Sequence, residues 1–183
     1  ACGLHGTGYL RDADELKLFT SDEIASISDK AISGLANDAL TKLDSDQIKA
    51  LTAKQIAALS SDHVSSLTSD QTKALKSDQI VALTAKQLAG LNIADLDTAQ
   101  VAVLTAKQIT TLTTDQLAAL DSGQVEALTS TQVKSLSAAA LATIDADELM
   151  LFTSDEIASI SDKAISGLAN DALTKLDSDQ IKA

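Results

Sequence analysis

The sequence predicts an all-α solenoid, or superhelix, of short capped helices with one helix in each eight-residue repeat. Three observations support this prediction: a period of eight, a helix N-cap signature in phase with it, and an apolar pair that flanks each cap. We label the repeat positions a to h, with b at residue 12 and every eighth residue to 84, then from 97 to 177. This gives 21 full copies and one short copy. A period this strict is typical of chains that fold by stacking repeats.

The same spacing excludes one long helix and excludes β-strands. Eight residues at about 100° each rotate the chain by about 800°, so the leucine at position a drifts by about 80° per repeat. No continuous apolar stripe then forms along a single helix. Positions a and f lie five and then three residues apart, which does not match the alternation of a strand. A short helix that begins again in every repeat satisfies the pattern.

Position b has the residues of a helix N-cap. It holds Thr, Ser or Asp in 18 of 21 copies, the exceptions being Ala36, Lys76 and Ala169. Position e, three residues later, holds Gln or Glu in 15 of 21 copies, which is the capping-box spacing. Positions a and f are apolar in 20 of 21 copies each, with Arg11 and Thr72 as the exceptions. They correspond to the hydrophobic staple that surrounds a capped N-terminus.

The remaining positions complete the predicted unit. Position h is mostly small, as at Ala58, Ser66, Gly90 and Thr111, so neighbouring helices are expected to approach closely there. Positions c, d and g are mostly polar or tolerant and are expected to face water. A helix of about six residues is too short to persist alone in water. Each unit therefore depends on its neighbours, although the number of units per superhelical turn does not follow from the sequence.

A longer repeat divides the chain into three predicted segments. Residues 145–183 repeat residues 12–50 at all 39 positions with one change, Lys17 to Met150, at an offset of 133 residues. We therefore predict a non-repeat leader, linker or cap at 1–11, one module at 12–144, and the start of a second, near-identical module at 145–183. The duplication is either natural or engineered.

A five-residue remainder at 91–95 interrupts the octads inside the first module. This truncated unit lacks its last three residues. Asn92 occupies position b there and is expected to act still as an N-cap. We expect a local kink or a phase shift of the solenoid at this point.

Composition argues against several classes of partner. The net charge is −12, from 14 basic and 26 acidic residues, whereas binding to nucleic acid or an anionic membrane needs basic clusters. No apolar run approaches the ~20 residues of a membrane span, so membrane insertion is not expected. The only aromatic residues are Tyr9, Phe19 and Phe152. A chain with so few large rings has few anchors for a deep ligand pocket.

No catalytic, cofactor-binding or metal-binding residues are predicted. His63 replaces Gln at position e, where its plain role is a substitute cap or a polar surface residue. His5 and Cys2 lie in the leader without a metal-ligand or nucleophile–base pattern around them. The densest acidic clusters, Asp12 to Glu15 and Asp145 to Glu148, lack the glycine and spacing of a calcium loop. We interpret them as caps that also complement the helix N-terminus.

The units Leu51–Leu59, Leu104–Leu112 and Leu112–Leu120 share the pattern Leu-Thr-x-x-Gln-Ile/Leu-x-x-Leu. This pattern resembles repeats in very large secreted or surface-attached bacterial proteins of the adhesin type, and the similarity covers residues 12–183. The resemblance implies an extracellular or cell-surface location and a spacer-like or fibre-forming role. It carries over no catalytic residues.

Three functional hypotheses follow. The leading one is a structural segment of an extended stalk, fibre or filament, with self-association end to end or laterally. The second is a solenoid scaffold that binds a protein or glycan partner through positions c, d and g. The third is an engineered repeat protein. An enzyme is not expected.

Overall fold

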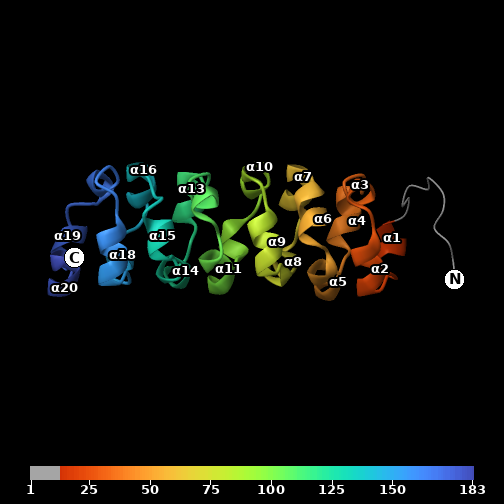
Figure 1. Cartoon of the computed structure of the whole chain (residues 1–183), viewed down its shortest axis with the longest axis horizontal. Helices are drawn as coiled ribbons and strands as arrows, with labels where there is room; N and C mark the ends of the chain where they lie inside the picture. Colours follow the sequence, from red (N-terminus) through yellow and green to blue (C-terminus); the bar gives the residue numbers. More distant parts are fainter. Residues whose placement is uncertain (1–12) are drawn as a thin grey trace.

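The computed structural model describes residues 13–183 and confirms the predicted all-α solenoid of short helices. The described residues form 20 α-helices and two 3-10 helices and contain no strand. The helices lie side by side along one axis, with α1 and α2 at one end and α19 and α20 at the other (Figure 1). The predicted leader at residues 1–11 lies outside the described residues, as does Asp12.

Helices begin again about every eight residues. In chain order they are α1 (Ala13–Leu16), α2 (Ser21–Ser26), α3 (Asp29–Ile32), α4 (Asn37–Thr41), α5 (Ser45–Ala50), α6 (Ala53–Ala58), α7 (Ser61–Ser65), α8 (Ser69–Ala74), α9 (Ser77–Ala82), α10 (Ala85–Leu88), η1 (Ile93–Asp95), α11 (Thr98–Ala102), α12 (Ala106–Ile109), α13 (Thr114–Ala118), α14 (Ser122–Glu126), α15 (Ser130–Val133), α16 (Ala138–Leu141), α17 (Ala146–Leu149), α18 (Ser154–Ser159), η2 (Ile165–Gly167), α19 (Ala172–Lys175) and α20 (Ser178–Lys182).

The capping box predicted from positions b and e is present along the array. In α6 the Thr52 hydroxyl accepts a hydrogen bond from the Gln55 amide at 3.2 Å, and Gln55 Oε1 accepts one from the Thr52 amide at 2.7 Å. Ala36 makes no side-chain cap, as its residue type requires. At Lys76 one half of the box remains, because its amide donates to Gln79 Oε1 at 2.7 Å. The caps re-initiate each helix and leave the backbone extended between helices.

Positions a and f form one continuous aliphatic core. The f residues Ile24, Ile32, Leu40 and Ile48 are completely buried, and Thr72, the polar exception at f, is buried with them. Most side chains at c, d and g are exposed, as predicted. The core is therefore a seam that runs the length of the stack.

Each helix packs against the helix three units further along the chain. Examples are α2 with α5, α3 with α6, α6 with α9, and α15 with α18. Side-chain hydrogen bonds between turns join residues 28 positions apart, as from Gln55 to the Ile27 carbonyl. Because this bond runs from position e to position a of the unit three octads earlier, one superhelical turn takes about three to three and a half octads.

The truncated unit at residues 91–95 takes the place of a whole octad. It forms the 3-10 helix η1, which packs against α8 and α13, three units away on either side. Ile93 is buried and fills the core position. The expectation that Asn92 caps this unit was wrong, because its side-chain amide instead donates to Asp95 at 2.8 Å. The order of stacking continues through this unit, and the expected kink or phase shift of the solenoid stays a prediction.

Small residues at position h allow adjacent turns to approach, as predicted. A Cβ added to Gly90 would lie 3.0 Å from the Ser61 carbonyl oxygen and 3.3 Å from the Ser65 Cβ. A Cβ added to Gly167 would collide with the backbone of Ala138. At these two positions any larger side chain requires the neighbouring turn to move.

Candidate functional site: the glutamine ladder and the open ends

The most organised polar feature of the molecule is a ladder of glutamine side chains. All 11 glutamines of the chain occupy position e. Ten of them are buried: Gln47, Gln55, Gln71, Gln79, Gln87, Gln100, Gln108, Gln124, Gln132 and Gln180. A buried amide is stable only when its donor and acceptor both find partners, and these side chains find them in two different turns of the superhelix.

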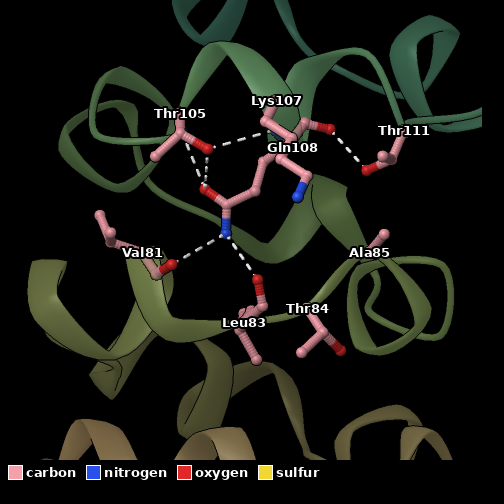
Figure 2. Close-up of a pocket in the computed structure, with 8 residues that line it drawn as sticks. All are labelled: Val81, Leu83, Thr84, Ala85, Thr105, Lys107, Gln108 and Thr111. Carbon is pink, nitrogen blue, oxygen red and sulfur yellow. Dashed lines mark hydrogen bonds between the residues drawn. The ribbon is translucent and has the colours of Figure 1, made fainter.

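Gln108 shows the geometry of one rung (Figure 2). Its Oε1 accepts from the Thr105 amide at 2.9 Å and completes the cap of its own helix. Its Nε2 donates to the carbonyls of Ile80 at 2.8 Å and Leu83 at 2.9 Å, in the preceding turn. One side chain thus starts its own helix and fastens that helix to the turn before it.

The position of the acceptors explains why a rung is needed. Within each unit the carbonyl at f already accepts from the backbone amide at the next position a, as Ile80 accepts from Leu83. The carbonyl at a points toward the next turn and receives the glutamine amide, as Leu51 does from Gln79 at 2.6 Å. Leaving a buried carbonyl without a donor costs roughly 1–3 kcal/mol. The ladder therefore stabilises both the cap and the stack.

Across the truncated unit the rungs keep their partners and change their spacing. Gln100 donates to the Leu75 carbonyl at 2.7 Å, 25 residues earlier, where Gln79 spans 28 residues to Leu51. The difference equals the three residues missing from η1. The connection between turns thus depends on the number of units and not on the number of residues.

A hollow of about 300 Å³ lies between two turns at this part of the ladder. It is lined by Val81, Leu83, Thr84, Ala85, Thr105, Lys107, Gln108 and Thr111, drawn in Figure 2. The amide of Gln108 is already bonded to both walls, and Lys107 is the only ionisable residue in the lining. The hollow therefore has no pair of groups for acid–base chemistry.

His63 is a rung of the ladder in which imidazole replaces the amide. Its Nδ1 accepts from the Ser60 amide at 3.2 Å, and its Nε2 lies 2.7 Å from the Leu35 carbonyl. These partners require the tautomer with hydrogen on Nε2. The predicted capping role is confirmed, whereas the alternative of a surface residue was wrong because His63 is buried.

Five consecutive units lack a rung, and we call them the glutamine-free seam. Their e residues are Ala140, Glu148, Glu156, Ala164 and Ala172. Neither a methyl group nor a carboxylate donates a hydrogen bond, so the facing carbonyls of the preceding turn receive none from these side chains. Glu148 and Glu156 keep the capping half of the role, accepting from Asp145 and Thr153 amides at 3.0 and 2.8 Å. The seam begins at the end of the first module and extends into the second.

The acidic cluster at 145–148 has the capping role predicted for it. Asp145 Oδ1 accepts from the amides of Asp147 and Glu148 at 2.8 Å each. Asp147 forms an ion pair with Lys175 in the following turn at 2.6 Å, and this hydrogen bond raises the pKa of the Lys175 ammonium. Among residues 13–183 no group of three or more His, Cys, Asp or Glu side chains is arranged to hold a metal ion.

The capping box of α2 also holds glutamate. The Thr20 amide and hydroxyl donate to Glu23 Oε2 at 2.8 and 2.9 Å, and these bonds lower the pKa of the Glu23 carboxyl. Cys2 and His5 lie outside the described residues. In the part of the chain that the structure describes, Glu23, His63 and the 145–148 cluster therefore all serve as helix caps.

Sequence reasoning identified the cap at position e but missed the rung. The signal was available in the residue type. Glutamate caps as well as glutamine does in a capping box, yet position e holds 11 glutamines and four glutamates. Only the amide carries a second group that donates, so the preference for glutamine indicates an acceptor outside the helix.

Comparison with known proteins supports a repeat protein. The profile of a family described as the ALTTAQ repeat matches residues 40–77 and 93–130, and the second match begins within the truncated unit. No curated protein matches the chain. None of the described helices is long and apolar enough to cross a membrane. Together with the fold, the profile match shows that the chain is a helical repeat protein built from stacked octads.

Proposed function

We propose that this chain is a structural segment of an extended bacterial extracellular or cell-surface protein, in which the solenoid serves as a stalk or fibre. The observation that carries the proposal is the continuity of the stack from the first module into the second. Helices α14, α15 and α16 pack against α17, α18 and η2 with the same three-unit spacing that holds inside the module. Modules joined in this way lengthen the rod without changing its cross-section.

The ladder supports a mechanical role over a binding role. Its buried side-chain amides are bonded to backbone amides and carbonyls, so they are not free to recognise a ligand. The resemblance to adhesin-type repeats supports the extracellular location. The low number of large aromatic side chains, three in 183 residues, agrees with a surface that is not specialised for a hot-spot interface.

The length of the rod gives a quantitative test. A 133-residue module contains sixteen octads and one truncated unit, which together make about five to six turns of three to three and a half units. With about 8–10 Å between packed helices, each module adds about 40–60 Å. Proteins with one, two and three modules should therefore differ by this increment in electron micrographs and in small-angle scattering. A length that does not grow with module number contradicts the proposal.

The location is tested separately in cells. Antibodies against the exposed surface of the solenoid should label intact bacteria that carry the full-length protein. Protease added outside the cells should remove the label. Protection from protease in intact cells, with loss only after lysis, contradicts an extracellular location.

A further inference from the structure

The glutamine-free seam and the five units before it differ at position e. The seam spans residues 137–176, and we call the preceding five units, residues 97–136, the ladder block. Every unit of the ladder block has glutamine at position e, whereas no unit of the seam does. The ladder resumes after the seam, where Gln180 Nε2 donates to the Phe152 carbonyl at 2.6 Å. The seam is therefore an interruption between two stretches of ladder.

Side-chain hydrogen bonds between turns follow the same division. In the ladder block each of the five glutamines donates to two or more carbonyls of the preceding turn, as Gln132 does to Val101 and Leu104 at 2.8 Å each. In the described chain, the one side chain of the seam that donates to an earlier turn is Lys175, which bonds Asp147 at 2.6 Å. Both partners of that ion pair are exposed, and exposed ion pairs contribute little to stability.

The residues whose carbonyls would accept the missing bonds are still buried. The 28-residue spacing of the other rungs places Leu120 opposite Glu148 and Leu128 opposite Glu156. Leu120 and Leu128 are 7% and 1% exposed. A carboxylate has no hydrogen to donate to these carbonyls, so the contact between turns lacks the bond that each glutamine supplies.

Negative charge also weakens the contact at the seam. The seam contains seven acidic and two basic residues, a net charge of −5, whereas the ladder block contains four and two, a net charge of −2. Like charges in neighbouring turns repel one another. Apolar packing holds the seam instead, and it is closest where a Cβ on Gly167 would meet the backbone of Ala138.

We propose that the stack opens first at the seam, between helices α14 to α16 and the next turn, α17 to η2, while the ladder on both sides stays closed. Helices α17 and α18 have four and six residues, and helices this short do not persist without neighbours. They therefore unfold together once the turns separate. The seam is a unit of low local stability within the rod.

Opening at the seam gives a stalk a segment that lengthens under tension, and this consequence rests on the proposed function. The five octads of the seam would gain about 120–130 Å, at about 3.3–3.6 Å per extended residue less the roughly 15 Å that they span when folded. Stretching the full chain between its two ends should show this step before any other. A chain that yields in a single step contradicts the consequence.

Hydrogen exchange of the full chain, measured by NMR, tests the opening itself without reference to a stalk. The Val101 amide donates to the Asp97 carbonyl in the ladder block, and the Leu149 amide donates to the Asp145 carbonyl in the seam, both at 2.9 Å. Each amide follows an aspartate N-cap with a complete capping box, so the local bonds are matched. We expect the Leu149 amide to exchange at least about tenfold faster than the Val101 amide.

Exchanging the residues at position e should exchange the behaviour of the two blocks. Glu148→Gln with Glu156→Gln supplies donors to the seam and should slow exchange at Leu149 at least about tenfold. Gln100→Glu with Gln108→Glu removes donors from the ladder block and should accelerate exchange at its matched amide by a similar factor. Circular dichroism verifies that each variant keeps its helices.

Glu148→Ala with Glu156→Ala is the matched control, because it removes the two charges without adding a donor, and it should not slow exchange at Leu149. All variants have the same chain ends, so differences among them report position e alone. The proposal is overturned if Leu149 is as protected as its ladder counterpart, if the glutamine variant leaves it unprotected, or if the alanine variant protects it equally. None of these outcomes depends on the length or location of the full protein, so a seam that stays closed and a failed stalk are distinguishable.

Discussion

Residues 12–50 and 145–183 have the same sequence at 38 of 39 positions but occupy different places in the stack. In the first block Leu40 is 0% exposed, and in the second its duplicate Leu173 is 52% exposed. The α-helix α3 (Asp29–Ile32) of the first block corresponds to residues 162–165 of the second, which form a turn that leads into the 3-10 helix η2 (Ile165–Gly167). The presence of a following turn, and not the local sequence, decides which of these side chains form core.

The caps show the opposite behaviour. Ser28 Oγ accepts from the Ala31 amide at 3.3 Å, and its duplicate Ser161 accepts from the Ala164 amide at the same distance. The cap forms in both blocks because its partners lie within one unit. Local hydrogen bonds are therefore a property of the octad, whereas burial is a property of the array.

The largest expected loss of stability comes from replacing a buried glutamine of the ladder with glutamate, the residue found at position e in the glutamine-free seam. In Gln79→Glu the carboxylate still accepts from the Lys76 amide, but it faces the Ile48 and Leu51 carbonyls that now accept from Nε2 at 2.7 and 2.6 Å. Loss of two donors at a buried site, together with a buried charge, should cost about 3–5 kcal/mol. Urea unfolding followed by circular dichroism measures this loss in the free energy of unfolding. Gln116→Glu, at the one glutamine that is only half-buried, is the milder control; equal losses would contradict the rung.

A pair of core substitutions compares the two blocks directly. Leu40→Ala removes a fully buried side chain and should lower the free energy of unfolding by about 3 kcal/mol. Leu173→Ala makes the same change in the same local sequence, and because half of the side chain is already exposed it should cost less than about 1 kcal/mol. Hydrogen exchange of the neighbouring amides locates each loss. Equal costs at the two positions would show that the following turn does not bury Leu40.

A pair of glycine substitutions tests the close approach between turns. Gly167→Ala should cost about 1–3 kcal/mol, because the new Cβ meets the Ala138 backbone and forces the turns apart. Gly34→Ala is the duplicate change, and its Cβ would lie 3.6 Å from the Ala31 carbonyl of its own helix. There alanine fits without a clash and lowers the conformational entropy of the unfolded chain, so the change should be near zero or a gain of about 0.5 kcal/mol. Thermal unfolding of the two variants should separate them clearly, and a harmless Gly167→Ala would contradict the contact.

The smallest expected effect is a gain in stability when glutamines are introduced into the glutamine-free seam. Glu148→Gln with Glu156→Gln supplies the missing amide donors and should raise the free energy of unfolding by about 1–2 kcal/mol in total. Glu15→Gln with Glu23→Gln is the matched control, since no earlier octad turn precedes these residues in the described chain, and it should change little. Urea midpoints compare the two variants. A repair that does not exceed its control would show that the carbonyls at the seam are satisfied in another way.

Most of the fold was predictable because the interactions that form each helix lie within one octad. The capping box at Thr52 and Gln55 and the burial of positions a and f follow from spacing within one octad. The three-unit spacing between packed helices was not predictable, because it depends on where the Gln55 amide finds an acceptor in another turn. Asn92 was misjudged for a related reason: in a five-residue unit its side chain reaches Asp95 before it reaches a free backbone amide.

The candidate site was predictable only where its hydrogen-bond partners lie close together in the sequence. The capping of the 145–148 cluster could be read from the sequence, because all of its partners except Lys175 lie within three residues. The second role of position e needed the structure. In that role the side-chain amide nitrogen at position e donates to carbonyls of the preceding turn. The donor and the acceptor belong to different repeat units, so no single unit of the sequence contains both.

The replacement of an octad by the five residues at 91–95 has a consequence for how such a protein changes over generations. Recombination between misaligned repeats inserts or removes whole octads, and small deletions shorten one. Since a shortened unit still occupies one step of the spiral, neither event disturbs the residues on both sides of it. We therefore expect genes that encode such arrays to tolerate changes in repeat number, with variants that differ in length while every remaining step of the stack is unchanged.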